Sequence, residues 1–139
     1  MYAADSLFVD YQMATNALQG IYMLSLKEKN MEKVRMVVKK QEELARFFEM
    51  GRYYEASCRL ELATMEKDAD TVIETVQEML STLGDIGNFS RSPLYEHMEF
   101  KEMRAEFVEE MRQTLLKSFR EGEAYDFLKG DARWKELIA

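Results

Sequence analysis

Residue types that build disulfide-rich, metal-rich or loop-rich folds are scarce in this sequence. The 139-residue chain contains one cysteine (Cys58), one histidine (His97), one proline and six glycines. A single cysteine excludes an internal disulfide framework and a multi-cysteine zinc site, and a single histidine excludes a histidine-rich metal site. So few prolines and glycines disfavour a loop-rich or multi-stranded β fold. Composition therefore favours an all-α protein.

Basic residues are missing from the first 26 positions, and no apolar run approaches the ~20 residues that cross a bilayer. The basic region of a secretory signal is thus absent, and a free thiol suits a reducing compartment, so we predict a cytoplasmic protein. Acidic residues outnumber basic ones 26 to 19, for a net charge of −7. This balance predicts no direct nucleic-acid contact and no membrane binding. The 47% hydrophobic content suffices for a folded core.

Apolar residues recur at helical spacing along most of the chain. In the first segment Leu7, Tyr11, Ala14, Leu18 and Ile21 lie on one helix face. Further helices are predicted over about 31–49, 52–67, 69–83 and 100–120, with Asn30 as the N-cap of the second and Asp68 or Asp70 as that of the fourth. The apolar stripe of the last one consists of Phe100, Met103, Phe107, Met111, Leu115 and Phe119. No hairpin signal appears, so we predict one all-α domain, residues 1–139, with an internal loop at 83–92 and a C-terminal docking segment at 121–139.

Two small residues and one large apolar residue are regularly spaced in residues 51–68. Ala56 and Ala63 lie two turns apart on one face, and Leu60 fills the space between them. With Gly51 ending one helix and Tyr53 opening the next, this pattern resembles the second half of a tetratricopeptide repeat. Asp68 stands where that repeat usually has proline. The resemblance implies an antiparallel helical-repeat array of about five main helices plus short C-terminal helices.

The second half of the chain adds a looser pattern. It comprises Ser92-Pro93-Leu94-Tyr95-x-His97, then Phe100-Lys101, Asp126-Phe127-Leu128, Asp131 and Trp134. From about residue 44 to residue 138 the chain resembles the C-terminal part of bacterial helix-turn-helix transcriptional regulators. That resemblance implies recognition of a protein or peptide rather than catalysis, as the sensor or oligomerisation part of such a regulator. No DNA-binding helix-turn-helix is found.

If the repeat geometry holds, the helix over 31–49 lines a groove. The stripe predicted to face a partner consists of Val38, Gln41, Ala45 and Phe48, flanked by Arg35 and Lys39. Gln41 is the most informative member, because a side-chain amide can bond the backbone of a bound peptide. An ordinary exposed glutamine is the alternative interpretation.

Charge is uneven along the chain: residues 27–48 have a local charge of +3 and residues 49–88 one of −6. One interpretation is that two solvated helix faces attract each other across an antiparallel pair. The other is a basic helix that lines a groove for an acidic partner.

The first helix is apolar, with Asp5 and Asp10 as its charged residues over 1–26. Units of a repeat array bury their apolar faces on their neighbours, so an end unit needs a cover. A further segment or a second copy would supply it, and we predict a homodimer.

Catalysis has little support in the sequence. His97 near Ser92 or Glu99 is the one acid–base candidate, and nothing in the pattern orients it. We therefore expect no enzyme activity, no cofactor and no metal, with a small enzyme or metal-dependent helical bundle as the alternative. Cys58 is expected to be a buried small side chain rather than a reactive thiol.

Overall fold

The computed structural model describes residues 3–86, 92–95 and 104–139, and over these ranges it is helical with no β-strand. The prediction of an all-α fold is confirmed. The elements are α1 (Ala3–Lys27), α2 (Met31–Phe47), α3 (Arg52–Met65), α4 (Ala69–Ser81), the 3-10 turns η1 (Leu83–Asp85) and η3 (Pro93–Tyr95), α5 (Ala105–Glu121), the 3-10 segment η4 (Glu123–Leu128) and α6 (Ala132–Leu137). His97, Phe100 and Met103, to which sequence-based roles were given, lie outside the described residues.

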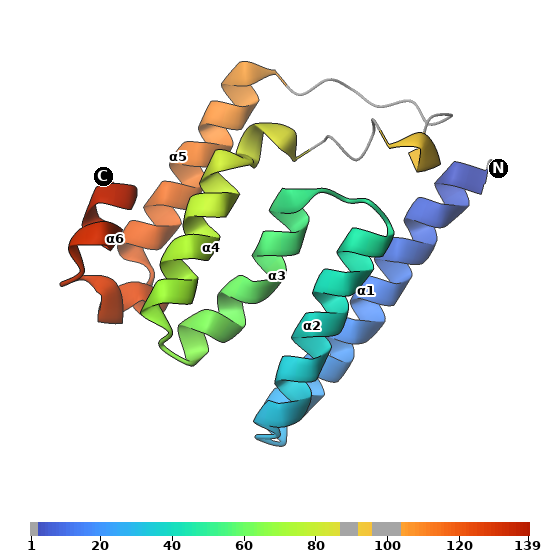
Figure 1. Ribbon diagram of the computed structural model, residues 1–139, viewed down its shortest axis with the longest axis horizontal. Helices are drawn as coiled ribbons and strands as arrows, with labels where there is room; N and C mark the ends of the chain where they lie inside the picture. Colours follow the sequence, from blue (N-terminus) through green and yellow to red (C-terminus); the bar gives the residue numbers. More distant parts are fainter. Residues whose placement is uncertain (1–2, 87–91, 96–103) are drawn as a thin grey trace.

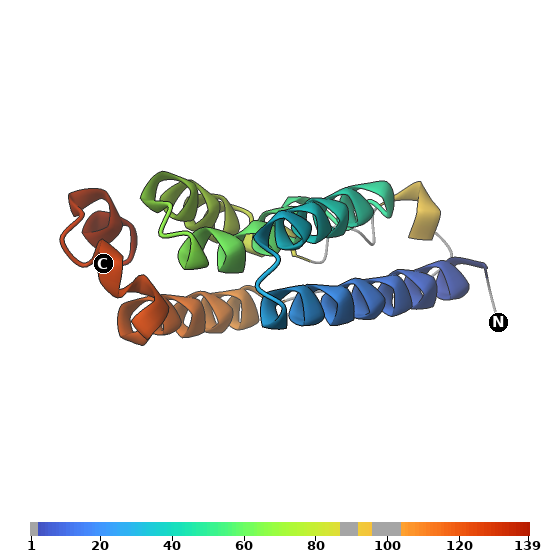
Figure 2. The same ribbon diagram turned by 90° about the horizontal axis from the view of Figure 1, so that it is seen from below.

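The helices form two layers. Helices α2, α3 and α4 lie side by side in one layer, and α1 and α5 lie in the other, α1 along α2 and α5 along α4 (Figure 1, Figure 2). Among the first four helices, each packs closely on the next along the chain. Helix α3 lies between α1 and α5 in Figure 1, and its side chains line hollows against each of them.

Short turns of one kind end the first three helices. Lys29, Glu49 and Lys67 each adopt a left-handed conformation, with φ between 53° and 58°. The next residue donates its backbone N–H to a carbonyl five positions earlier, as in Asp68 N to Ala63 O at 3.0 Å. This is the hydrogen-bond pattern of a Schellman cap. Gly51 was expected to supply the left-handed stop of α2, but Glu49 does so, and Gly51 (φ 104°) instead precedes α3.

Side-chain caps open the helices that follow. Asn30 accepts a hydrogen bond from the Lys33 N–H at 3.2 Å, as predicted. Of the two candidates for the cap of α4, Asp68 and Asp70, it is Asp68 that accepts a hydrogen bond from the Thr71 N–H, at 3.2 Å. The Thr71 hydroxyl also donates to Asp68 at 2.7 Å. These caps satisfy N–H groups that have no partner within the helix.

The largest cluster of buried side chains joins α3, α4, α5 and the C-terminal turns. Trp134, 2% exposed, stacks on Tyr125 with ring centroids 5.4 Å apart and meets Phe119 edge-on at 5.9 Å. A second cluster, around Tyr11, Ala45, Met50 and Tyr95, holds η3 against α1 and α2. A third joins α1 to α2 through Tyr22, Val34, Val37 and Val38.

Helix α5 begins later than the sequence indicated. Its first residue is Ala105, whereas the apolar stripe predicted a start near residue 100, a position outside the described residues. Phe119 from that stripe is buried, but Phe107 is 51% exposed. Near the N-terminus of α5 the stripe therefore faces partly to solvent.

Candidate functional site

Much of the stripe predicted to face a partner lies under α1 instead. Val38 is 5% exposed and packs with Tyr22 and Leu18 of α1, and Ala45 is fully buried beside Tyr11. Phe48 is half-buried and meets the Tyr11 ring at 5.5 Å. The apolar part of the stripe was placed on an open groove because the sequence does not reveal which neighbour covers α2. Helix α1 covers it.

The polar members of the predicted set remain accessible. Lys39 is exposed, and Arg35 is exposed but paired at 2.8 Å with Glu66, the C-cap of α3. Gln41 is half-buried at the edge of the α1–α2 contact, where its Nε2 donates to Gln19 Oε1 at 3.2 Å. Of the six residues, Gln41 lines a concave part of the surface.

That concavity, called the polar cleft below, lies where α1, α2 and α3 converge. It encloses about 180 Å³ and is lined by Tyr11, Thr15, Gln19, Tyr22, Gln41, Ser57, Cys58 and Glu61. Its lining offers amide, hydroxyl and carboxylate groups beside aromatic rings. This volume corresponds to about six waters at ~30 Å³ each. It is smaller than the ~300–1,000 Å³ of sites for drug-sized ligands.

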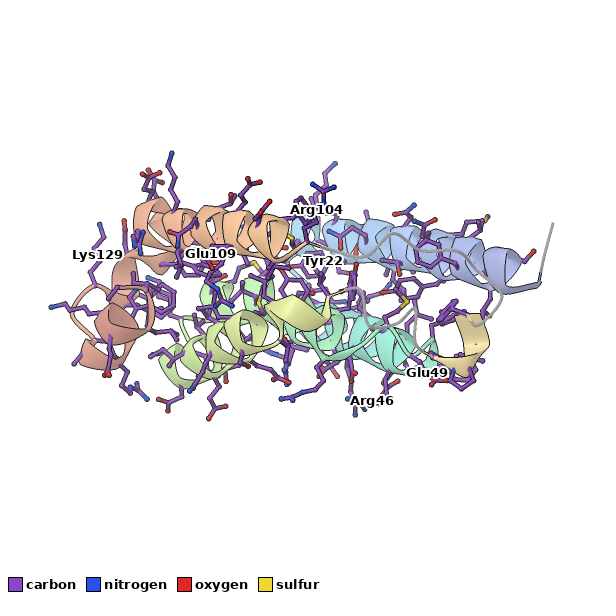
Figure 3. The ribbon with its side chains drawn as sticks, turned by 90° about the horizontal axis from the view of Figure 1, so that it is seen from above. Tyr22, Arg46, Glu49, Arg104, Glu109 and Lys129 are labelled. Carbon is purple, nitrogen blue, oxygen red and sulfur yellow. The ribbon has the colours of Figure 1, made fainter. Side chains whose placement is uncertain are left out.

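Tyr22 is the most unusual residue of the polar cleft. It is 2% exposed and lies between the two layers of helices (Figure 3). Its buried hydroxyl makes no hydrogen bond of regular geometry within the described residues, although it interacts with the Glu61 side chain. Burial, the negative charge of Glu61 and the hydrogen-bonding contact with that carboxylate raise the pKa of Tyr22 to about 12, so the hydroxyl keeps its proton at neutral pH. A buried polar group left unsatisfied costs ~1–3 kcal/mol.

Two other polar groups of the cleft wall, on Ser57 and Cys58, have a local partner. Ser57 Oγ donates to the Tyr54 carbonyl at 2.9 Å, and Cys58 Sγ donates to the same carbonyl at 3.2 Å. Burial, helped by the charge of Glu42, raises the pKa of the Cys58 thiol to about 11. Since the thiolate is the nucleophile, Cys58 is a poor one at neutral pH.

Ion pairs hold together the helices that form the cleft. Arg59 of α3 bridges Glu42 of α2 at 3.5 Å and Glu78 of α4 at 2.9 Å. Arg46 of α2 likewise meets Glu55 of α3 at 2.9 Å. The basic stretch 27–48 thus uses part of its charge on the acidic helix beside it, which is the first of the two interpretations of the charge pattern.

The residues named for helix-pair packing occupy the contacts of α3. Ala56 is fully buried and Ala63 is 5% exposed, so both permit close approach of neighbouring helices. Leu60 is half-buried against the largest core cluster. Tyr53, also half-buried, lines a more apolar hollow of about 290 Å³ between α3 and α5, together with Phe107 and Met111.

Sequence reasoning found Gln41 but missed Gln19, Tyr22 and Glu61. Tyr22 follows the recurring positions Leu7, Tyr11 and Leu18 at helical spacing, so periodicity marks it as buried. Periodicity carries no signal that its hydroxyl lacks a regular hydrogen bond, because this depends on three helices meeting.

Comparison of the chain with protein-family models, with curated proteins and with solved structures found no match. Over the described residues, no helix combines the length and apolarity needed to span a membrane. No group of three or more metal-ligating side chains occurs there either.

Proposed function

We propose that this protein is a non-catalytic interaction module that binds an extended peptide segment of a protein partner at the polar cleft. The observation that carries the proposal is the convergence of two side-chain amides, Gln19 and Gln41, on a cleft whose buried Tyr22 hydroxyl makes no hydrogen bond of regular geometry within the described residues. A peptide backbone offers an N–H and a C=O at every residue apart from proline. Such groups match amides that both donate and accept.

The composition of the cleft favours a peptide over other ligands. Glu61 makes the cleft unsuitable for a phosphate or another strongly acidic ligand. The small volume accommodates a short stretch of backbone or one polar side chain. The apolar hollow between α3 and α5 offers a second contact, suited to an apolar side chain of the same partner.

The arrangement of helices is compatible with a tetratricopeptide-like array. Consecutive helices pack on each other, similar left-handed turns recur at residues 29, 49 and 67, and Ala56 and Ala63 are the small contacts that such a repeat requires. With the resemblance described above, this supports a role as the sensor or oligomerisation part of a bacterial transcriptional regulator.

Selection from a phage-displayed library of random peptides tests the peptide-binding function. We expect enriched peptides to bind the unmodified chain and to lose affinity for Gln41→Ala and Gln19→Ala. The matched controls are Gln113→Ala on α5 and Gln12→Ala on α1, both exposed and remote from the cleft lining. Failure to enrich any peptide, or equal binding by cleft variants and controls, would contradict the proposal.

A further inference from the structure

One face of α1 is exposed, uncharged in its middle and oppositely charged at its ends. Its residues follow each other at alternating steps of three and four, and we call them the α1 seam: Asp10, Met13, Ala17, Gly20, Leu24 and Lys27. All six are exposed, with Met13 at 64% and Leu24 at 54%. At 3.6 residues per turn they occupy about 100° of the helix circumference.

The middle of the α1 seam is unusually flat. Gly20 has no side chain, and a Cβ built there meets nothing within 4 Å. With Ala17 it forms a small-residue crossing point, flanked by the large apolar side chains of Met13 and Leu24. Small residues at a helix contact let two backbones approach closely, while larger ones on either side fill the space around the crossing.

The seam is symmetric about its own centre. A twofold axis passing midway between residues 18 and 19, perpendicular to α1, places residue 13 opposite residue 24 of a second copy and residue 17 opposite residue 20. The same axis places Asp10 opposite Lys27 at both ends. Neither of these charged residues forms an ion pair within the described part of the chain.

We propose that the α1 seam binds a second copy of this chain as an antiparallel helix pair, with Ala17 against Gly20 at the crossing and Asp10 paired with Lys27 at each end. A parallel pairing would instead bring like charges together at both ends. A membrane surface is a poorer occupant, because the seam lacks the several basic residues that anionic lipids attract. This goes beyond the proposed function, since the polar cleft does not include any seam residue.

The size of the seam sets the expected strength of the dimer. From residue 10 to residue 27 it is about 25 Å long. A single helix pair of that length buries less than the ~800 Å² per partner of a standard interface. We therefore expect a reversible dimer that dissociates in the micromolar range rather than a permanent one.

Sedimentation velocity from low to several hundred micromolar protein tests the pairing. The unmodified chain should pass from monomer to dimer, and Gly20→Glu should raise the dissociation constant at least about tenfold. Circular dichroism would show that this variant is still folded, as expected where an added side chain has open space. The matched control is Gln12→Glu, which adds the same charge to an exposed position of α1 outside the seam and should leave dimerisation unchanged.

Charge reversal tests the antiparallel register. Asp10→Lys alone and Lys27→Asp alone should each weaken the dimer, because both ends then carry like charges. The double variant should restore it, as should an equimolar mixture of the two single variants. Lys27→Asp places a negative charge at the C-terminus of α1, which the helix dipole disfavours, and residue 10 lies too far from either end of α1 to compensate, so restoration cannot come from a more stable α1. A chain that stays monomeric at every concentration, or a double variant that is no better than the single ones, would overturn the proposal.

Discussion

Removing the buried hydroxyl of Tyr22 should stabilise the protein. The ring of Tyr22 packs with Val34, Val37 and Val38, and Phe retains those contacts. The hydroxyl makes no hydrogen bond of regular geometry among the described residues, so Tyr22→Phe removes a buried polar group and loses only its weak contact with Glu61. From the ~1–3 kcal/mol cost of such a group, we expect the free energy of unfolding at pH 7 to rise by about 1 kcal/mol or more.

The difference should widen in alkaline solution. The pKa of Tyr22 is raised from 10.0 to about 12 in the folded protein. As the pH rises, the unfolded chain therefore loses this proton before the folded protein does. The contribution of protonated Tyr22 to the free energy of unfolding is fully present below pH 10 and is lost as the pH rises through 12. At ~1.4 kcal/mol per pKa unit, the advantage of Tyr22→Phe should grow by roughly 1 kcal/mol by about pH 11.

Urea unfolding followed by fluorescence of Trp134, the single tryptophan, measures both effects. Tyr95→Phe is the matched control, because the buried Tyr95 hydroxyl donates to the Phe48 carbonyl at 2.7 Å. That variant should lose about 0.5–1.5 kcal/mol at pH 7. If Tyr22→Phe were destabilising to the same extent, the Tyr22 hydroxyl would make a regular hydrogen bond and the reasoning would be refuted.

Four further changes have defined expectations, each measured by thermal or urea unfolding. Gly20→Ala, in open space on α1, should stabilise the chain by about 0.5–1 kcal/mol through helix propensity, and no gain would mean that this part of α1 is not helical. Ala56→Phe should destabilise by ~1–3 kcal/mol through overpacking of a fully buried site, and unchanged stability would contradict the α3 contacts. Lys67→Gly should gain about 1 kcal/mol because φ is 53° there, and a loss would argue against the left-handed turn. Asp68→Ala should lower the melting temperature at pH 7. The Thr71 hydroxyl and N–H hold the pKa of Asp68 below its usual value, so the stabilising contribution of Asp68 is lost as the pH falls through that pKa, and the effect of the substitution should shrink in acid. An effect independent of pH would exclude the charged cap.

The helices could be predicted from the sequence because each one carries its own signals. The apolar spacing of Leu7, Tyr11 and Leu18 marked one face of α1, and Asn30 was identified as the N-cap of α2. The left-handed residues that end the helices were harder to predict, since Lys29, Glu49 and Lys67 have no backbone preference for that conformation. The sequence favoured Gly51 instead.

The site was less predictable because it depends on which helices meet. Gln41 was identified by its position on α2, but Val38 and Ala45 were assigned to an open groove that α1 covers. The missing information was tertiary: Tyr11 and Tyr22 of α1 pack against α2, and Glu61 of α3 completes the polar cleft. No spacing along a single helix encodes that arrangement.

Mapping a selected peptide by amide chemical-shift changes on the labelled chain tests the central claim most directly. The account predicts shifts concentrated on the polar cleft, at Gln19, Gln41, Ser57 and Glu61, with the exposed α5 residue Gln113 unaffected. Shifts confined to the α1 seam or to the apolar hollow, with the polar cleft unchanged, would contradict it.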